Sequence, residues 1–181
     1  MISEKYADEI KGIMARFPSK KSAVLPLMYL AQHEHGYMSQ AAMQEVAELL
    51  DLDPTHILSL AGFYTMFYEE SVGKFVLEIC NDLACCLRSG EDFLAMARQK
   101  LDVDAKGNSK DGLFSIKPVM CLAACDNAPM LQCNLKYYEN LDEAKFDELI
   151  AQLRERADSD GGDLHVIQKI AAYAKSLDGA A

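Results

Sequence analysis

Four cysteines in two closely spaced pairs offer the clearest chemistry in this sequence. Four residues separate Cys80 from Cys85, three separate Cys121 from Cys125, and the two pairs lie well apart along the chain. Thiolates are the ligands of soft sites such as zinc and iron–sulfur centres. If the chain folds back on itself, both pairs can reach one centre. The sequence therefore predicts a four-cysteine metal site.

Two kinds of centre suit these spacings. A [2Fe–2S] cluster takes four thiolates, and a C-x₄-C pair occurs among ferredoxin ligand patterns. Zinc ligands usually come in C-x₂₋₄-C pairs, so a Cys₄ zinc module for protein binding remains an alternative, as do unligated or disulfide-linked thiols. A redox dithiol of the C-x-x-C type does not occur. Spacing favours the iron–sulfur cluster and leaves the other two possibilities open.

The residues around the cysteines also favour a cluster. They are small or apolar, which lets backbone N–H groups approach the sulfurs and keeps water back, two factors that set a cluster's potential. These neighbours are Leu83, Ala84, Leu122, Ala123, Ala124 and Ala128.

Two further cysteines and the histidines are weaker candidates. Cys86 directly follows Cys85, and adjacent residues seldom point at the same metal. Cys133 lies in a predicted strand, where a free cysteine is commonly a small buried residue. His33 and His35 are two apart and face different sides of a predicted helix. Glycine-rich phosphate loops are absent, so we expect no dinucleotide site and no catalytic residues on this chain.

Composition and charge narrow the class of protein. Half of the 181 residues are apolar and a quarter are charged, as in soluble globular proteins. The net charge of −10 argues against a nucleic-acid partner, because phosphate binding needs clustered Lys and Arg. No apolar run approaches the roughly 18–20 residues of a membrane helix, and the start has no secretory pattern. We expect a cytoplasmic protein with reduced thiols and no direct membrane insertion.

The first part of the chain predicts a helical bundle over residues 1–72. Apolar residues recur at helical spacing over residues 3–17. A second helix starts near Ser22 and continues to Gly36. Ser39 caps a third helix, and Asp53 followed by proline starts a fourth.

The pattern changes to an α/β domain over residues 73–157. Strands are predicted at 75–79 and 113–120, a helix after Ser89 with a capping-box acid at Asp92, a hairpin at 130–138 and a helix after Asp142. Pro118 suggests an edge strand or a bulge. Both cysteine pairs then lie in loops at strand ends, where an α/β layer presents ligands. Residues 158–181 read as an acidic linker followed by an amphipathic helix.

Four segments carry a resemblance to a known family. "AVLPLMYLAQHEHG" (23–36), "GFYTMF" (62–67), "VGKFVLEIC" (72–80) and "CLAACDNAPM" (121–130) resemble the thioredoxin-like [2Fe–2S] subunit of NADH:quinone oxidoreductase, respiratory complex I. The likeness covers about residues 6–156. It implies an α/β fold class, with an N-terminal helical bundle followed by a thioredoxin-like [2Fe–2S] ferredoxin domain.

The resemblance also implies the site, the cofactor and the partner. Cys80, Cys85, Cys121 and Cys125 would bind one [2Fe–2S] cluster that exchanges an electron with FMN. The FMN and NADH would sit on a partner flavoprotein subunit, within a larger respiratory complex peripheral to the membrane. Similar subunits serve NAD-reducing or electron-bifurcating hydrogenases and NAD-dependent formate dehydrogenases, which remain an alternative. The family often carries a larger residue at the position of Cys86, so the choice between Cys85 and Cys86 stays open.

Overall fold

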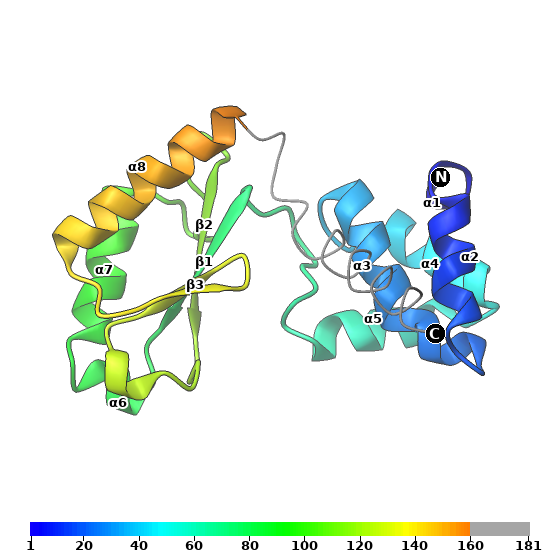
Figure 1. Ribbon diagram of the computed structural model, residues 1–181, viewed down its shortest axis with the longest axis horizontal. Helices are drawn as coiled ribbons and strands as arrows, with labels where there is room; N and C mark the ends of the chain where they lie inside the picture. The colour runs from blue at the N-terminus through cyan, green and yellow to red at the C-terminus, as the bar shows by residue number, and fades with distance from the viewer. Residues whose placement is uncertain (160–181) are drawn as a thin grey trace, which may run out of the picture. The chain divides into compact units, whose positions relative to one another are not determined.

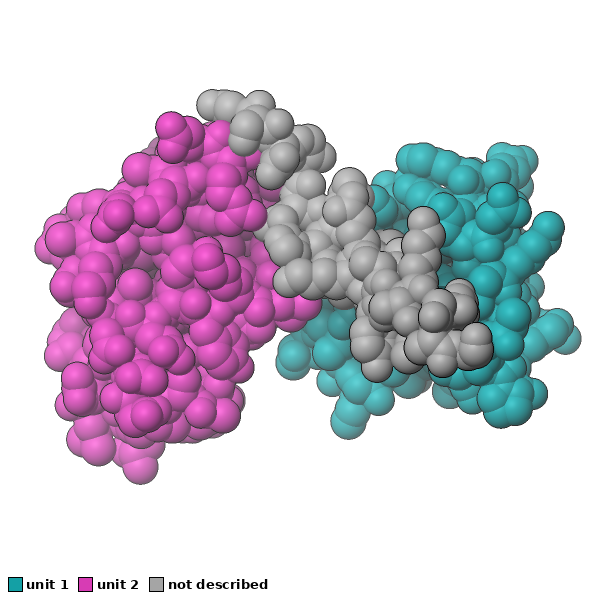
Figure 2. All heavy atoms as spheres, viewed as in Figure 1, with its two compact units in different colours: residues 1–71, 164–181 teal, residues 72–163 magenta. Residues whose placement is uncertain are grey.

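Two compact units make up the described part of the chain, residues 1–159 of a computed structural model (Figure 1). Met1–Ser71 forms the first unit and the second begins at Val72, as the two colours in Figure 2 show. Each unit has its own hydrophobic core. The functional division at residues 72 and 157 stays a prediction. The helix predicted near the C-terminus lies outside the described residues.

The first unit is helical, as predicted. Its helices are α1 (Ile2–Lys5), α2 (Ala7–Ala15), α3 (Val24–His35), α4 (Gln40–Leu50) and α5 (Pro54–Phe63), with a 3₁₀ turn η1 (Lys20–Ala23) before α3. Two predicted caps are confirmed. The Ser39 hydroxyl accepts from the Ala42 N–H (3.1 Å), and the Asp53 carboxylate accepts from the Thr55 N–H (2.7 Å).

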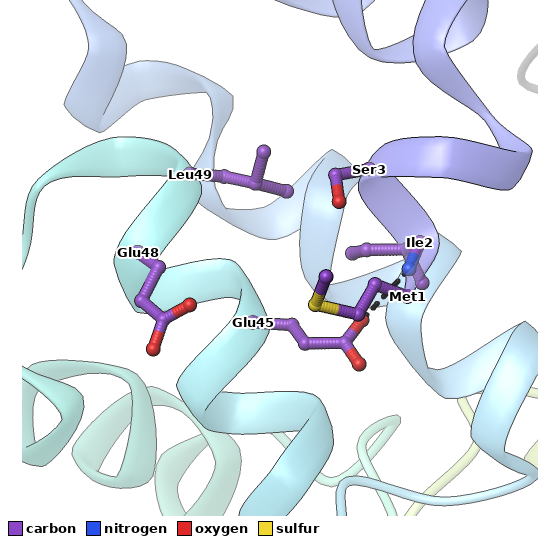
Figure 3. A pocket seen from close by; sticks show the side chains of 6 residues that line it. All are labelled: Met1, Ile2, Ser3, Glu45, Glu48 and Leu49. Atoms are coloured by element: carbon purple, nitrogen blue, oxygen red, sulfur yellow. Dashed lines mark hydrogen bonds between the residues drawn. The ribbon is translucent and has the colours of Figure 1, made fainter.

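The single helix predicted over residues 3–17 is wrong, because the chain bends at Tyr6, whose φ of −122° and ψ of 33° are not helical. Tertiary contacts account for the bend. The Tyr6 hydroxyl donates to Glu34 (2.9 Å). Ile2 is fully buried, and its N–H donates to Glu45 on α4 (2.8 Å). This hydrogen bond lies beside a small pocket, and no cysteine is among the residues that line it (Figure 3). Periodicity in the sequence carries no information on these distant partners.

The second unit is built on a four-stranded sheet. Its strands are β1 (Phe75–Cys80), β2 (Phe114–Val119), β3 (Leu131–Cys133) and β4 (Lys136–Tyr138), in the order β2-β1-β3-β4. β1 and β2 are parallel, and the other pairs are antiparallel. The edge position expected from Pro118 is confirmed, since β2 is an outer strand. The predicted hairpin is also confirmed, by β3 and β4.

Two helices cover one face of this sheet (Figure 1). They are α7 (Gly90–Lys100) and α8 (Glu143–Ser159), and they meet through Phe93 and Phe146, whose rings stand edge to face at 5.6 Å. Alternate residues of β1, beginning with Phe75, belong to the same core, as expected for a strand of period two. Because β1 and β2 run parallel, the loops that follow these two strands leave the sheet at the same end.

Three local expectations in this unit need correction. Cys85 and Cys86 lie in a short helix, α6 (Leu83–Cys86), and not in an open loop. Ser89 does not form the predicted cap, because its φ of 63° turns the chain left-handed and its side chain makes no capping hydrogen bond. Asp142 does cap α8, accepting from the Lys145 N–H (2.8 Å), but α8 continues to Ser159, beyond the predicted end.

No helix within residues 1–159 has both the length and the apolar character needed to cross a membrane.

Candidate metal centre

The first cysteine pair is held by regular structure. Cys80 is the last residue of β1, and its N–H donates to the Met130 carbonyl (3.3 Å). The next residue, Asn81, donates to the carbonyl of Val119 on β2 (3.1 Å), so both neighbouring segments fix this strand end. Cys85 follows in α6. Both cysteines are buried, at 1% exposure each.

The second pair lies in a less regular loop. Cys121 follows β2, and Cys125 opens a 3₁₀ turn, η2 (Cys125–Asn127). Their sulfurs are 3.3 Å apart. Between them, Ala123 adopts φ 62° and points its N–H at the Cys121 sulfur (3.4 Å). This contact confirms that small residues here let the backbone approach sulfur. Both cysteines of this pair are exposed.

A small apolar core joins the two loops. It is separate from the core of the sheet and consists of Cys80, Cys85, Ala124, Ala128 and Met130. Two of these residues come from the end of β1 and the segment after it, and the other three follow β2. Burial of this group therefore holds both cysteine loops at one end of the sheet, beyond the carboxyl ends of β1 and β2. The structure brings together the loops that the sequence predicted to converge.

Burial and the neighbouring thiols raise the pKa of a cysteine in each pair. The pKa of Cys85 is raised to about 12, chiefly by burial, with smaller contributions from a hydrogen bond to Cys80 and from the negative charges of Cys80, Cys125 and Cys121. A hydrogen bond to Cys121 is the largest cause that raises the pKa of Cys125. Metal ligation needs thiolates, and crowded thiolates need nearby cations. Four such donors fit an iron–sulfur cluster.

The sulfurs are grouped as two pairs. Among residues 1–159, no three or more His, Cys, Asp or Glu side chains form a group that could hold one metal ion. A two-iron cluster, in contrast, has two protein ligands on each iron. The pairing of Cys80 with Cys85 and of Cys121 with Cys125 is compatible with that division.

Cys86 and Cys133 occupy different surroundings. Cys133 lies in β3 at 4% exposure, which confirms the expected small buried residue. Cys86 is exposed, and its thiol donates to the Asn81 carbonyl (3.1 Å). That Cys86 is no ligand stays a prediction.

Two residues near the site were not identified from the sequence. The Tyr137 hydroxyl, on β4, donates to the Leu122 carbonyl in the second cysteine loop (3.0 Å). Gly90, at the start of α7, packs directly against the backbone of Cys85. The first contact joins segments 15 residues apart and has no local signal. The only hint of the second was a glycine at the beginning of a helix, where other residues are usually favoured.

Comparison with known proteins decides the family. Residues 10–154 match the family described as thioredoxin-like [2Fe-2S] ferredoxin. The chain belongs to this family. The expected fold class and the [2Fe–2S] cofactor are thereby confirmed, and the zinc alternative is set aside.

Curated relatives agree with this family. The chain is 35% identical over 147 residues to an E-type subunit of NADH-quinone oxidoreductase from Rhizobium meliloti (strain 1021), covering 81% of this chain and 88% of the relative. It is 38% identical over 143 residues to the E-type subunit of NADH-quinone oxidoreductase from Rickettsia typhi, covering 77% and 84%. The chain is thus similar to subunits of an oxidoreductase complex, and its role is that of a [2Fe–2S] electron-transfer subunit.

A solved structure shares the fold. It is the crystal structure of an NAD⁺-reducing [NiFe]-hydrogenase in the air-oxidized state, with a TM-score of 0.61 and 17% identity. The match covers 72% of this chain and 23% of that chain.

Proposed function

We propose that this chain is the electron-transfer subunit of an NADH:quinone oxidoreductase, respiratory complex I, and that Cys80, Cys85, Cys121 and Cys125 hold its [2Fe–2S] cluster. The observation that carries the proposal is that the two cysteine loops share one small apolar core at the end of the sheet where β1 and β2 finish. When bound, the cluster supplies one-electron exchange. The buried pair keeps water from one side of it, and the exposed pair leaves the other side accessible.

The proposed partner is a flavoprotein subunit that binds NADH and FMN, and the electron is exchanged with this FMN. Large exposed apolar side chains close to the cysteines in the sequence support a protein partner here, since exposed apolar surface commonly marks an interface. Leu83, Leu87 and Met120 are 74%, 81% and 74% exposed. The complete active site would then belong to the complex, which we place on the cytoplasmic side, peripheral to the membrane.

A second assembly is the alternative. The corresponding subunit of an NAD-reducing or bifurcating hydrogenase, or of an NAD-dependent formate dehydrogenase, would use the same site in the same way. The fold shared with the NAD⁺-reducing [NiFe]-hydrogenase favours keeping this candidate. Co-purification from the native source distinguishes them: quinone reductase activity in a membrane-bound complex supports complex I, and a soluble hydrogenase or formate dehydrogenase supports the alternative.

The cofactor assignment is tested on the isolated full-length chain. Anaerobically purified protein should be brown-red, contain about two irons per chain, and give a [2Fe–2S] EPR signal after reduction with dithionite. A colourless protein with zinc and no such signal would overturn the proposal.

The ligand assignment is tested by substitution. Serine in place of Cys80, Cys85, Cys121 or Cys125 should each perturb or abolish the visible spectrum. Matched controls are Cys86→Ser and Cys133→Ser, which should leave the spectrum largely intact. Loss of the spectrum in Cys86→Ser would reassign the second ligand from Cys85 to Cys86.

A further inference from the structure

Gly90 makes an unusually close contact with the first cysteine pair. After α6 the chain reverses within three residues, helped by the left-handed φ of 63° at Ser89, and α7 then begins at Gly90. In this turn the Arg88 N–H donates to the Cys85 carbonyl (3.0 Å). The reversal brings the buried Gly90 onto the backbone of Cys85.

No side chain fits at this position unless the backbone shifts. A Cβ atom on Gly90 would lie 2.8 Å from both the carbonyl carbon and the carbonyl oxygen of Cys85, and 3.1 Å from its Cβ. The closest atoms are backbone, so no rotation of a side chain relieves the overlap. Either the start of α7 or the Cys85 backbone must move.

The two elements differ in how firmly they are held. α7 packs Phe93, Leu94 and Ala97 into the core of the sheet. α6 has four residues, and Cys85 is its one buried residue. Cys85 packs only into the small core of five buried residues, whereas α7 packs into the larger core of the sheet, so the overlap should move Cys85 and not α7.

We propose that Gly90 is a positioning residue for the cluster ligand Cys85: the missing side chain lets the start of α7 support the Cys85 backbone and fixes where its sulfur is presented. The inference rests on the proposed assignment of Cys85 as a ligand. Residues that orient a metal ligand commonly change metal affinity by about 10–100-fold when substituted.

The test compares alanine at three glycines in the full-length protein. Gly90→Ala should lose iron to a chelator roughly tenfold faster than the parent protein, with a shifted reduction potential and altered EPR g values. Gly73→Ala is the matched control for steric overlap, since its Cβ would lie 2.6 Å from the Phe114 backbone, away from the cysteines. It should lower thermal stability but leave the EPR g values unchanged. Gly12→Ala, with nothing within 4 Å, should raise thermal stability slightly, because alanine suits the interior of helix α2 better than glycine, and should leave the g values unchanged.

The outcomes separate this inference from the ligand assignment. If Gly90→Ala folds with the g values, potential and iron release of the parent, the positioning role is refuted. If Gly73→Ala alters the g values as much as Gly90→Ala, the effect is general destabilisation and the inference again fails. If Cys85→Ser keeps the parent spectrum, the ligand assignment fails whatever Gly90→Ala does.

A second variant covers poor folding of Gly90→Ala. Adding Ser89→Gly frees the left-handed turn, because glycine adopts many more backbone conformations than serine. The turn can then adjust to the added methyl group, and we expect the double variant to fold. It should still release iron faster than the Ser89→Gly single variant, because Cys85 loses the support of α7. A folded double variant with the iron release, g values and potential of Ser89→Gly alone would overturn the proposal.

Discussion

The two cysteine pairs have similar short spacings but differ in burial and in the backbone that carries them. Cys80 and Cys85 are buried on a strand end and a helical turn, and backbone hydrogen bonds to neighbouring segments hold the end of the strand at Cys80. Cys121 and Cys125 are exposed in a loop that contains a left-handed residue and a 3₁₀ turn.

This difference suggests that the two pairs have separate roles. A buried pair on regular elements gives a fixed, water-poor attachment, whereas an exposed pair leaves the same centre open to a redox partner. Such a cluster would be rigid on one side and approachable on the other. Four predictions test the comparison, beginning with the largest expected effect.

The rate of alkylation should show the largest difference between the two pairs. In protein stripped of its cluster, iodoacetamide should modify Cys121 and Cys125 at least roughly tenfold faster than Cys85, because burial limits access and raises the pKa of Cys85. Mass spectrometry after timed quenching measures each rate. Cys86 is the exposed control: with the cluster bound it should stay reactive, while Cys121 and Cys125 become protected. Equal rates at Cys85 and Cys125 would mean that the first pair is not buried in solution.

In the cluster-free protein, replacing a cysteine with serine should lower the free energy of unfolding more in the buried pair than in the exposed pair. Cys80→Ser places a hydroxyl where the thiol is 1% exposed, and burying a poorly paired hydroxyl costs about 1–3 kcal/mol. Cys121→Ser leaves a hydrated hydroxyl and should change the free energy of unfolding by less than about 0.5 kcal/mol. Urea unfolding measures both. Similar losses in the two variants would contradict the contrast between the pairs.

The hydroxyl of Tyr137 should stabilise the exposed loop to a smaller extent. Tyr137→Phe removes its hydrogen bond to Leu122, and a partly exposed bond of this kind contributes about 0.5 kcal/mol. We expect iron release to a chelator to be roughly twofold faster. Tyr138→Phe, the neighbouring position in β4, is the control. No change in Tyr137→Phe would show that the loop holds its shape without this bond.

Lowering the pH should have the smallest effect on stability. The effect arises just before the start of β2, at the opposite end of this strand from the exposed pair. Asp111 precedes β2 and accepts from the Ser109 hydroxyl, the Leu113 N–H and Arg154. The Ser109 hydrogen bond is the largest of the causes that hold the pKa of Asp111 at about 2, below the ordinary 3.8.

A depressed carboxyl pKa stabilises the folded protein above the ordinary value, and this contribution disappears as the pH falls from about 4 to about 2. The free-energy difference between the parent and Asp111→Asn should therefore shrink over that range. Because the pair with Arg154 is more than a third exposed, we expect less than about 1 kcal/mol. Urea unfolding of cluster-free protein at pH 6 and pH 3 measures it; a constant difference would contradict the assignment.

Local signals made much of this architecture predictable. Ser39 and Asp53 start their helices through contacts within three residues, so the sequence itself carries the information. The same holds for the alternation of Phe75, Leu77 and Ile79 in β1. One error arose where distant partners contact the chain: the break at Tyr6 lies beside the contacts of Tyr6 with Glu34 and of Ile2 with Glu45, far along the chain.

For the site, residue types and spacing by themselves predicted a four-cysteine metal centre, because thiol chemistry and the short interval within each pair are local properties. Tertiary structure decided which pair is buried and which is exposed. It also decided that Gly90 lies against the Cys85 backbone and that Tyr137 donates a hydrogen bond to the second loop. Burial and close approach depend on elements brought together by the parallel β1–β2 crossover, and no local pattern in the sequence specifies them.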